Sequence, residues 1–131
     1  MLKPIINMFS GGILLLSAFG STVLAQTLPI RHGQYVVSSV KCSDAPNASI
    51  LVWDGKGFSG AHSSACASNA NRRPDGRYDV ATACTALGDG THTSTGSQVK
   101  DNMILTALSP KKFIVTKANV HDLSYRWCSA K

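Results

Sequence analysis

Four cysteines constrain the fold of this chain more than any other feature. Cys42, Cys66, Cys84 and Cys128 are the only cysteines among its 131 residues. In an exported chain, an even number of widely spaced cysteines is typical of disulfides, whereas structural zinc sites use closely paired ligands such as C-x-x-C. No two of these cysteines have such a spacing. We therefore expect two disulfides, with no metal and no other cofactor.

Four cysteines can pair in three ways, and the spacing alone does not choose among them. We prefer Cys66 with Cys84 and Cys42 with Cys128, because the second pair would join the first and last strands of a closed sheet. On the loop-entropy model, the longer loop would contribute about 4.6 kcal/mol of stability and the shorter about 3.2 kcal/mol. Crosslinks of this strength matter in a small domain, whose net stability is usually only ~5 to 15 kcal/mol.

The first 25 residues have the pattern of a cleaved signal peptide. Lys3 supplies a positive start, an apolar run begins at Ile13, and Ala25 ends a Val-Leu-Ala triplet of the kind that signal peptidase cuts. Small and polar residues interrupt this apolar run, which is shorter than the ~20 residues needed to span a bilayer. We expect residues 1–25 to be a leader and residues 26–131 to be one domain that does not span a membrane. The expected location is periplasmic or secreted.

The pattern in residues 26–131 predicts an all-β domain. No window shows an apolar stripe of helical period, and short segments rich in Val, Ile, Thr and aromatic residues alternate with clusters of Gly, Pro, Asn and Asp. The expected strands are 34–42, 49–53, a return strand from Phe58, 63–67, 77–84, 103–108, 112–116 and 123–128. Residues 69–76 are expected to form a loop, and 91–100 an edge strand or a loop. About seven or eight strands in an antiparallel meander suit a small closed barrel or a sandwich.

The charge of the chain is positive but dispersed. It has 13 Lys and Arg residues against 7 acidic residues, all of them Asp, for a formal net charge of +6. The basic residues form no run longer than two and are not interleaved with aromatic residues, as a nucleic-acid interface would require. We therefore expect no nucleic-acid partner. The expected partner is an envelope protein or a small apolar ligand, and we expect the protein to be a monomer.

A set of short motifs along the chain resembles small exported proteobacterial proteins of unknown function. The motifs are Gly33-x-Tyr35, Cys42-x-x-Ala45-Pro46, Trp53-Asp54-Gly55, Cys66, Cys84, Gly88-Asp89-Gly90 and Tyr125-Arg126-Trp127-Cys128. The resemblance covers nearly all of the region after the leader, and it implies no activity, substrate or catalytic residue. In size, export and strand content the chain is also similar to the periplasmic β-barrels that inhibit lysozyme, a likeness of architecture alone.

Four side chains are the candidates for a binding site: Trp53, His62, Asp89 and Arg126. A barrel mouth that takes a small apolar ligand needs aromatic side chains, and the chain offers Tyr35, Trp53, Phe58, Tyr78, Tyr125 and Trp127. Asp89 lies between two glycines, but the alternating acids of a calcium loop are missing, which favours a plain turn. Because neighbours in a strand face opposite sides, an inward Trp127 would leave Arg126 in solvent, ready for an acidic partner.

Two functional hypotheses follow from these residues. The first is a non-catalytic exported envelope protein that binds a partner protein or a small ligand. The alternative is a small secreted hydrolase or nuclease, in which His62 moves a proton with the help of Asp54 and Arg126 steadies a developing negative charge. The chain contains no nucleophile motif such as G-x-S-x-G. The sequence therefore favours the non-catalytic hypothesis.

Overall fold

A computed structural model describes residues 27–94 and 97–130 of the chain. The predicted signal peptide, residues 1–25, lies outside the described residues. Within the described part, none of the helices has the length and apolar character needed to cross a membrane. The elements are β1 (Gly33–Val37), η1 (Cys42–Asp44), η2 (Asn47–Ser49), β2 (Ile50–Trp53), β3 (Phe58–Ser59), β4 (Ser63–Arg72), β5 (Tyr78–Leu87), β6 (Val99–Ser109), β7 (Lys112–Thr116) and β8 (Leu123–Ser129), where η marks a single turn of 3₁₀ helix.

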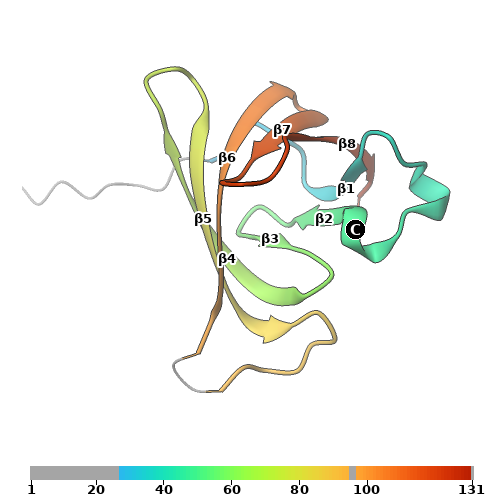
Figure 1. The fold of residues 1–131 in the computed structure, drawn as a ribbon, viewed down its shortest axis with the longest axis vertical. Coiled ribbons are helices and arrows are strands. Elements are labelled where there is room, and N and C mark those ends of the chain that lie inside the picture. The colour runs from blue at the N-terminus through green and yellow to red at the C-terminus, as the bar shows by residue number, and fades with distance from the viewer. Residues whose placement is uncertain (1–26, 95–96, 131) are drawn as a thin grey trace, which may run out of the picture.

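All eight strands belong to one antiparallel sheet, in the order β3-β2-β1-β8-β7-β6-β5-β4. The sheet curls so that its two outer strands approach each other (Figure 1). There the amide of Ser68 donates to the carbonyl oxygen of Lys56 at 2.8 Å, and the amide of Phe58 donates to the Ser68 hydroxyl at 3.1 Å. The all-β prediction is confirmed, and the architecture is a nearly closed barrel rather than a sandwich.

Gly57 makes this closure sterically possible. A Cβ atom at Gly57 would lie 2.2 Å from the carbonyl oxygen of Cys66, which belongs to the backbone of β4 and has little room to move. We expect Gly57→Ala to lower the free energy of unfolding by about 2 kcal/mol, within the usual cost of overpacking. Urea denaturation measures this loss.

The matched control for that substitution is Gly60→Ala on the other side of β3. A Cβ atom at Gly60 would have its nearest neighbour at 3.7 Å, so it fits without displacement. We expect this control to stay within about 0.5 kcal/mol of the wild type. Equal losses in the two variants would contradict the role of Gly57 in closing the barrel.

The barrel interior is filled by alternate residues of each strand. In β5, Val80, Thr82, Cys84 and Ala86 are buried while the residues between them are more exposed, as the period-two pattern requires. At the centre of the core lies Phe113, which is fully buried. Its ring centroid is 4.8 Å from that of Tyr35, 5.9 Å from that of Phe58 and 5.4 Å from that of Tyr125.

The segment before β1 closes one end of the barrel. Leu28 and Ile30 are buried and belong to the same core cluster as the aromatic rings. Tyr35 donates its hydroxyl hydrogen to the carbonyl oxygen of Arg31 at 2.7 Å, which fixes this segment against the barrel. The guanidinium carbon of Arg31 also lies 4.7 Å from the centre of the Trp127 ring. We call this the plugged end.

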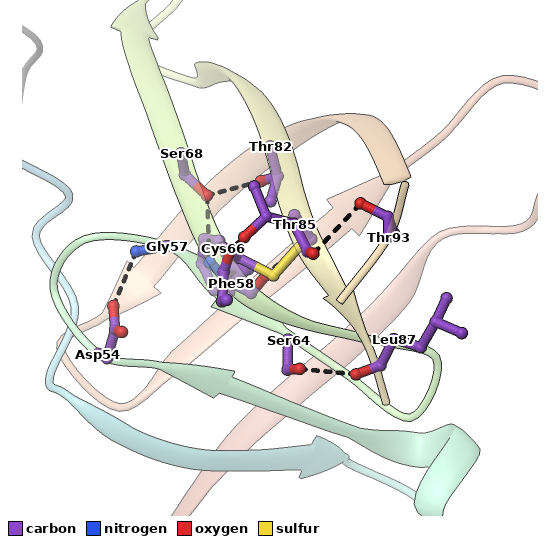
Figure 2. The surroundings of a disulfide bond; sticks show 12 residues. Asp54, Gly57, Phe58, Ser64, Cys66, Ser68, Thr82, Thr85, Leu87 and Thr93 are labelled. Atoms are coloured by element: carbon purple, nitrogen blue, oxygen red, sulfur yellow. Dashed lines mark hydrogen bonds between the residues drawn. A yellow bond between two sulfur atoms is a disulfide. The ribbon is translucent and has the colours of Figure 1, made fainter. Parts of the chain in front are cut away.

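The two disulfides join Cys42 to Cys128 and Cys66 to Cys84, which confirms the preferred pairing. Cys66 and Cys84 lie directly opposite each other in the β4–β5 ladder (Figure 2). Cys42 lies in η1 just after the first strand, and Cys128 lies in the last strand. The described residues contain no free cysteine.

The strand boundaries differ from the sequence prediction in four places, one of which is β5, which continues to Leu87 instead of ending at Cys84. β1 ends at Val37 instead of reaching Cys42, because the chain turns there and the amide of Val40 donates to the Val37 carbonyl oxygen at 2.9 Å. β4 continues to Arg72 through polar residues that were expected to form a loop, since each of them pairs with a residue of β5. β6 begins at Val99, so most of residues 91–100 are not strand.

Candidate functional site

The end of the barrel opposite the plug contains a cavity of about 370 Å³. Side chains of β2, β3, β6, β7 and β8 form its apolar wall: Ile50, Leu51, Phe58, Met103, Val115 and Leu123. Its polar lining includes His62, Asp101, Lys117 and His121. The volume lies at the lower end of the range for small-molecule sites and is enough for about a dozen water-sized groups.

Tight backbone packing holds His62 beside the cavity. The β3–β4 turn is closed by reciprocal hydrogen bonds between the backbones of Gly60 and Ser63, at 3.1 and 3.4 Å. This turn rests against the β5–β6 loop so closely that a Cβ atom on Gly88 would lie 1.8 Å from the carbonyl oxygen of Ala61. The side chain of His62 is exposed. The turn therefore presents this imidazole at the mouth without burying it.

An ion pair lies in the polar part of the lining. The Lys117 Nζ atom is 2.6 Å from Oδ2 of Asp101, and both side chains are partly exposed to solvent. A pair of this kind contributes little to stability, typically about 0.2 to 1 kcal/mol. Its main consequence for the site is that the two charges largely cancel each other beside the cavity.

Tyr125 contributes a phenol hydroxyl to the lining. Only 6% of its surface is exposed, and its ring stacks on Phe113 with an interplanar angle of 18°. Burial raises the pKa of the Tyr125 phenol, and the negative charge of Asp101 raises that pKa further. Its hydroxyl makes no hydrogen bond to any residue that the structure describes. The group is therefore a neutral donor without a protein partner.

The raised tyrosine pKa values predict a loss of stability at high pH. Burial raises the pKa of both Tyr35 and Tyr125 above the ordinary 10.0. A pKa that is higher in the folded than in the unfolded state gives stability that is present below the unfolded pKa and is lost as the pH rises through the folded pKa. We expect urea midpoints to fall above pH 10, and to fall less steeply in Tyr125→Phe. An identical slope in the variant and the wild type would contradict this account.

Of the four predicted site residues, only His62 lines the cavity. Trp53 is buried in the core, with its ring centroid 4.6 Å from that of Phe58, and its indole nitrogen has no hydrogen-bond partner among the described residues. Arg126 donates to the carbonyl oxygen of Val40 at 2.5 Å, and its second terminal nitrogen lies 3.2 Å from the sulfur of Cys42. It thus holds the segment after β1 against β8 beside the disulfide.

The two acidic candidates close turns. Asp54 Oδ1 accepts the amides of Lys56 and Gly57, each at 2.8 Å, in the β2–β3 turn. Burial acts to raise the pKa of this carboxyl, but the backbone hydrogen bonds and the nearby positive charge of Lys56 together outweigh burial and lower the pKa. Asp89 Oδ1 accepts the amide of Thr91 at 2.9 Å, and this bond lowers the pKa of Asp89. Each carboxylate therefore has a local backbone role.

The three residues of the hydrolase hypothesis do not meet. Asp54 and His62 lie in turns at opposite ends of the short strand β3, and Arg126 belongs to β8. Over residues 27–94 and 97–130, no group of three or more His, Cys, Asp or Glu side chains is arranged to hold a metal ion. Comparisons of the chain with protein families, with curated proteins and with solved structures give no match. A function is therefore inferred from the cavity itself.

Some of the residues that line this cavity could be predicted from the sequence. Among the six aromatic residues proposed for a barrel mouth, Phe58 and Tyr125 line the cavity. Strand alternation also places Met103 and Val115 on the inward face, which a period-two reading can find. The plug formed by Leu28 and Ile30 determines which end of the barrel stays open. No sequence pattern predicts how these two residues pack.

Proposed function

We propose that the protein is a non-catalytic exported binding protein whose barrel cavity takes a small, mainly apolar ligand. The observation that carries the proposal is the cavity of about 370 Å³ at one end of a barrel whose other end is filled. An apolar wall with a few polar groups is the usual composition of a small-molecule site. The cavity favours a small ligand over a partner protein, because its concave apolar surface would match only a narrow protrusion of a protein.

The proposed location is periplasmic or extracellular. Both disulfides need an oxidising compartment to form and persist. The leader pattern of residues 1–25 supports the same location, since it is the pattern of a chain directed out of the cytosol. A barrel crosslinked by two disulfides suits a carrier or sensor of small molecules in the envelope.

The surroundings of His62 support the non-catalytic part of the proposal. General acid–base catalysis needs an imidazole within about 3 Å of a nucleophile or an orienting group. Within the described ranges, His62 has no hydrogen bond, ion pair or ring contact with another side chain. This side chain is therefore placed to border a ligand.

Ligand binding is tested with n-butylbenzene, an apolar probe of about ten non-hydrogen atoms that suits the cavity volume. The oxidised protein, labelled at its methionine methyl groups, is titrated and followed by NMR. We expect the Met103 methyl signal to shift and to saturate, because Met103 is buried and lines the cavity. A Met103 signal that does not respond would contradict the proposed function.

Two matched leucine variants locate the binding site. Leu123 is 37% exposed at the cavity, and Leu108 is 54% exposed and does not line it. We expect Leu123→Asp to weaken n-butylbenzene binding about tenfold, since a charge must lose water beside an apolar ligand. Leu108→Asp should leave the affinity unchanged. Equal effects in the two variants would show that the probe binds elsewhere.

A further inference from the structure

The buried hydroxyl groups of the barrel differ in one respect. Tyr35 donates to the carbonyl oxygen of Arg31 at 2.7 Å, and Ser49 donates to that of Pro46 at 2.7 Å. Thr82 shares a hydrogen bond of 2.6 Å with Ser68 (Figure 2). Tyr125 is equally buried, yet its hydroxyl has no partner in the described part of the chain. Among the described residues, the only partnerless side-chain nitrogen or oxygen that is fully shielded from solvent is the Trp53 indole nitrogen, so the Tyr125 hydroxyl is accessible and free to bind a partner from outside the protein.

The position of the Tyr125 hydroxyl indicates where a partner from outside the protein would bind. Tyr125 lines the cavity, and stacking on the fully buried Phe113 limits the movement of its ring. Apolar side chains such as Met103 and Val115 share the same wall. A ligand in the cavity would therefore meet one fixed hydrogen-bond donor within an otherwise mainly apolar surface.

The charges beside the cavity restrict what that partner can be. Burial, and to a smaller extent the negative charge of Asp101, raises the pKa of Tyr125, so a negative charge is disfavoured at the phenol. A negatively charged group of a ligand beside this phenol is disfavoured for the same reason as the ionised phenol. The Lys117 ammonium group is paired with Asp101 at 2.6 Å, so it is not a free positive charge that could replace the water lost by an anionic ligand. His62 and His121 border the cavity from exposed positions.

We propose that the cavity selects a neutral ligand with an apolar body and one carbonyl oxygen, which accepts a hydrogen bond from the Tyr125 hydroxyl. This inference rests on the proposed function and defines the ligand class of the same site. The apolar body packs against the wall that includes Met103, and the carbonyl oxygen accepts a hydrogen bond from the Tyr125 hydroxyl, which no described residue engages. A carboxylate of equal length is rejected, because its charge would lose its water in a mainly apolar cavity.

Three probes of similar size test the selection: 2-nonanone, nonanoate and n-butylbenzene. Their affinities for the oxidised protein are measured by calorimetry at pH 7.5. We expect 2-nonanone to bind about tenfold more tightly than nonanoate, because the anion would lose its water in an apolar cavity. In Tyr125→Phe, the ratio of the 2-nonanone to the n-butylbenzene affinity should fall about fivefold, the usual effect of one neutral hydrogen bond. Tyr78→Phe, outside the cavity lining, should keep the wild-type ratio.

A second variant tests the part played by charge. Asp101→Asn leaves the Lys117 ammonium without its partner, so the affinity for nonanoate relative to 2-nonanone should rise about threefold. If n-butylbenzene binds but the ketone ratio is unchanged in Tyr125→Phe, the selection is overturned while the proposed function stands. Equal affinities for ketone and carboxylate in the wild type would also overturn it. If none of the three probes binds, the proposed function fails and this inference fails with it.

Discussion

Replacing Cys42 and Cys128 together by alanine is expected to lower the free energy of unfolding by about 4 kcal/mol. The two cysteines are separated by 86 residues, so their crosslink removes more disorder from the unfolded chain than the Cys66–Cys84 crosslink, which spans 18. Arg126 also loses its contact with the Cys42 sulfur in this variant. Since small domains have only ~5 to 15 kcal/mol of net stability, this variant loses a large part of the free energy of unfolding of the barrel.

The second disulfide gives the matched control. Cys66→Ala with Cys84→Ala should cost about 3 kcal/mol on the same model. Urea denaturation of both double variants, each with its other disulfide intact, measures the order of the two losses. A larger loss for the Cys66–Cys84 variant would contradict the view that loop length sets the contribution of each crosslink.

Phe113→Ala is expected to lower the free energy of unfolding by about 4 kcal/mol. The ring is fully buried and contacts Tyr35, Phe58 and Tyr125, which come from three other strands. Removing it leaves a void at the centre of the barrel and loosens the stacking partner of Tyr125. Phe113→Leu, which fills part of the same space, should cost about 1.5 kcal/mol.

Thermal or urea unfolding of the two Phe113 variants checks this order. If the alanine and leucine variants lost the same stability, the lost volume would not be the cause. If neither lost more than about 1 kcal/mol, Phe113 would not lie at the centre of the core, because surface substitutions have effects of that size or smaller.

Much of the fold could be predicted because local patterns decide it. The alternation in β5 follows directly from Tyr78, Val80 and Thr82 facing one side, and a strand of this period has only one way to bury its apolar face. The limits of β7 coincide with the prediction because Pro110 precedes it and polar residues follow it. The disulfide pairing follows from the topology, since consecutive antiparallel strands place Cys66 opposite Cys84.

Other features escaped prediction because tertiary contacts decide them. The polar end of β4 looks like a loop in sequence, but Asn71 pairs with Asp79 and remains on the outer face, where polarity costs nothing. Arg126 has no sequence signal for its hydrogen bond to Val40, because the two are 86 positions apart. The cavity itself depends on small residues at one end of the barrel and on a plug at the other.

The most direct test of the proposed ligand cavity is a search for NOEs between bound 2-nonanone and the methyl and aromatic protons of the oxidised protein. We expect NOEs from the alkyl chain of the ligand to Met103 and Leu123. We also expect NOEs from the protons beside the carbonyl group of the ligand to the Tyr125 ring. We expect no NOEs from the ligand to Leu28 or Ile30. NOEs to these two plug residues, or a spectrum in which the ligand contacts only outer-surface methyl groups, would contradict a barrel whose ligand cavity lies at the end opposite its plug.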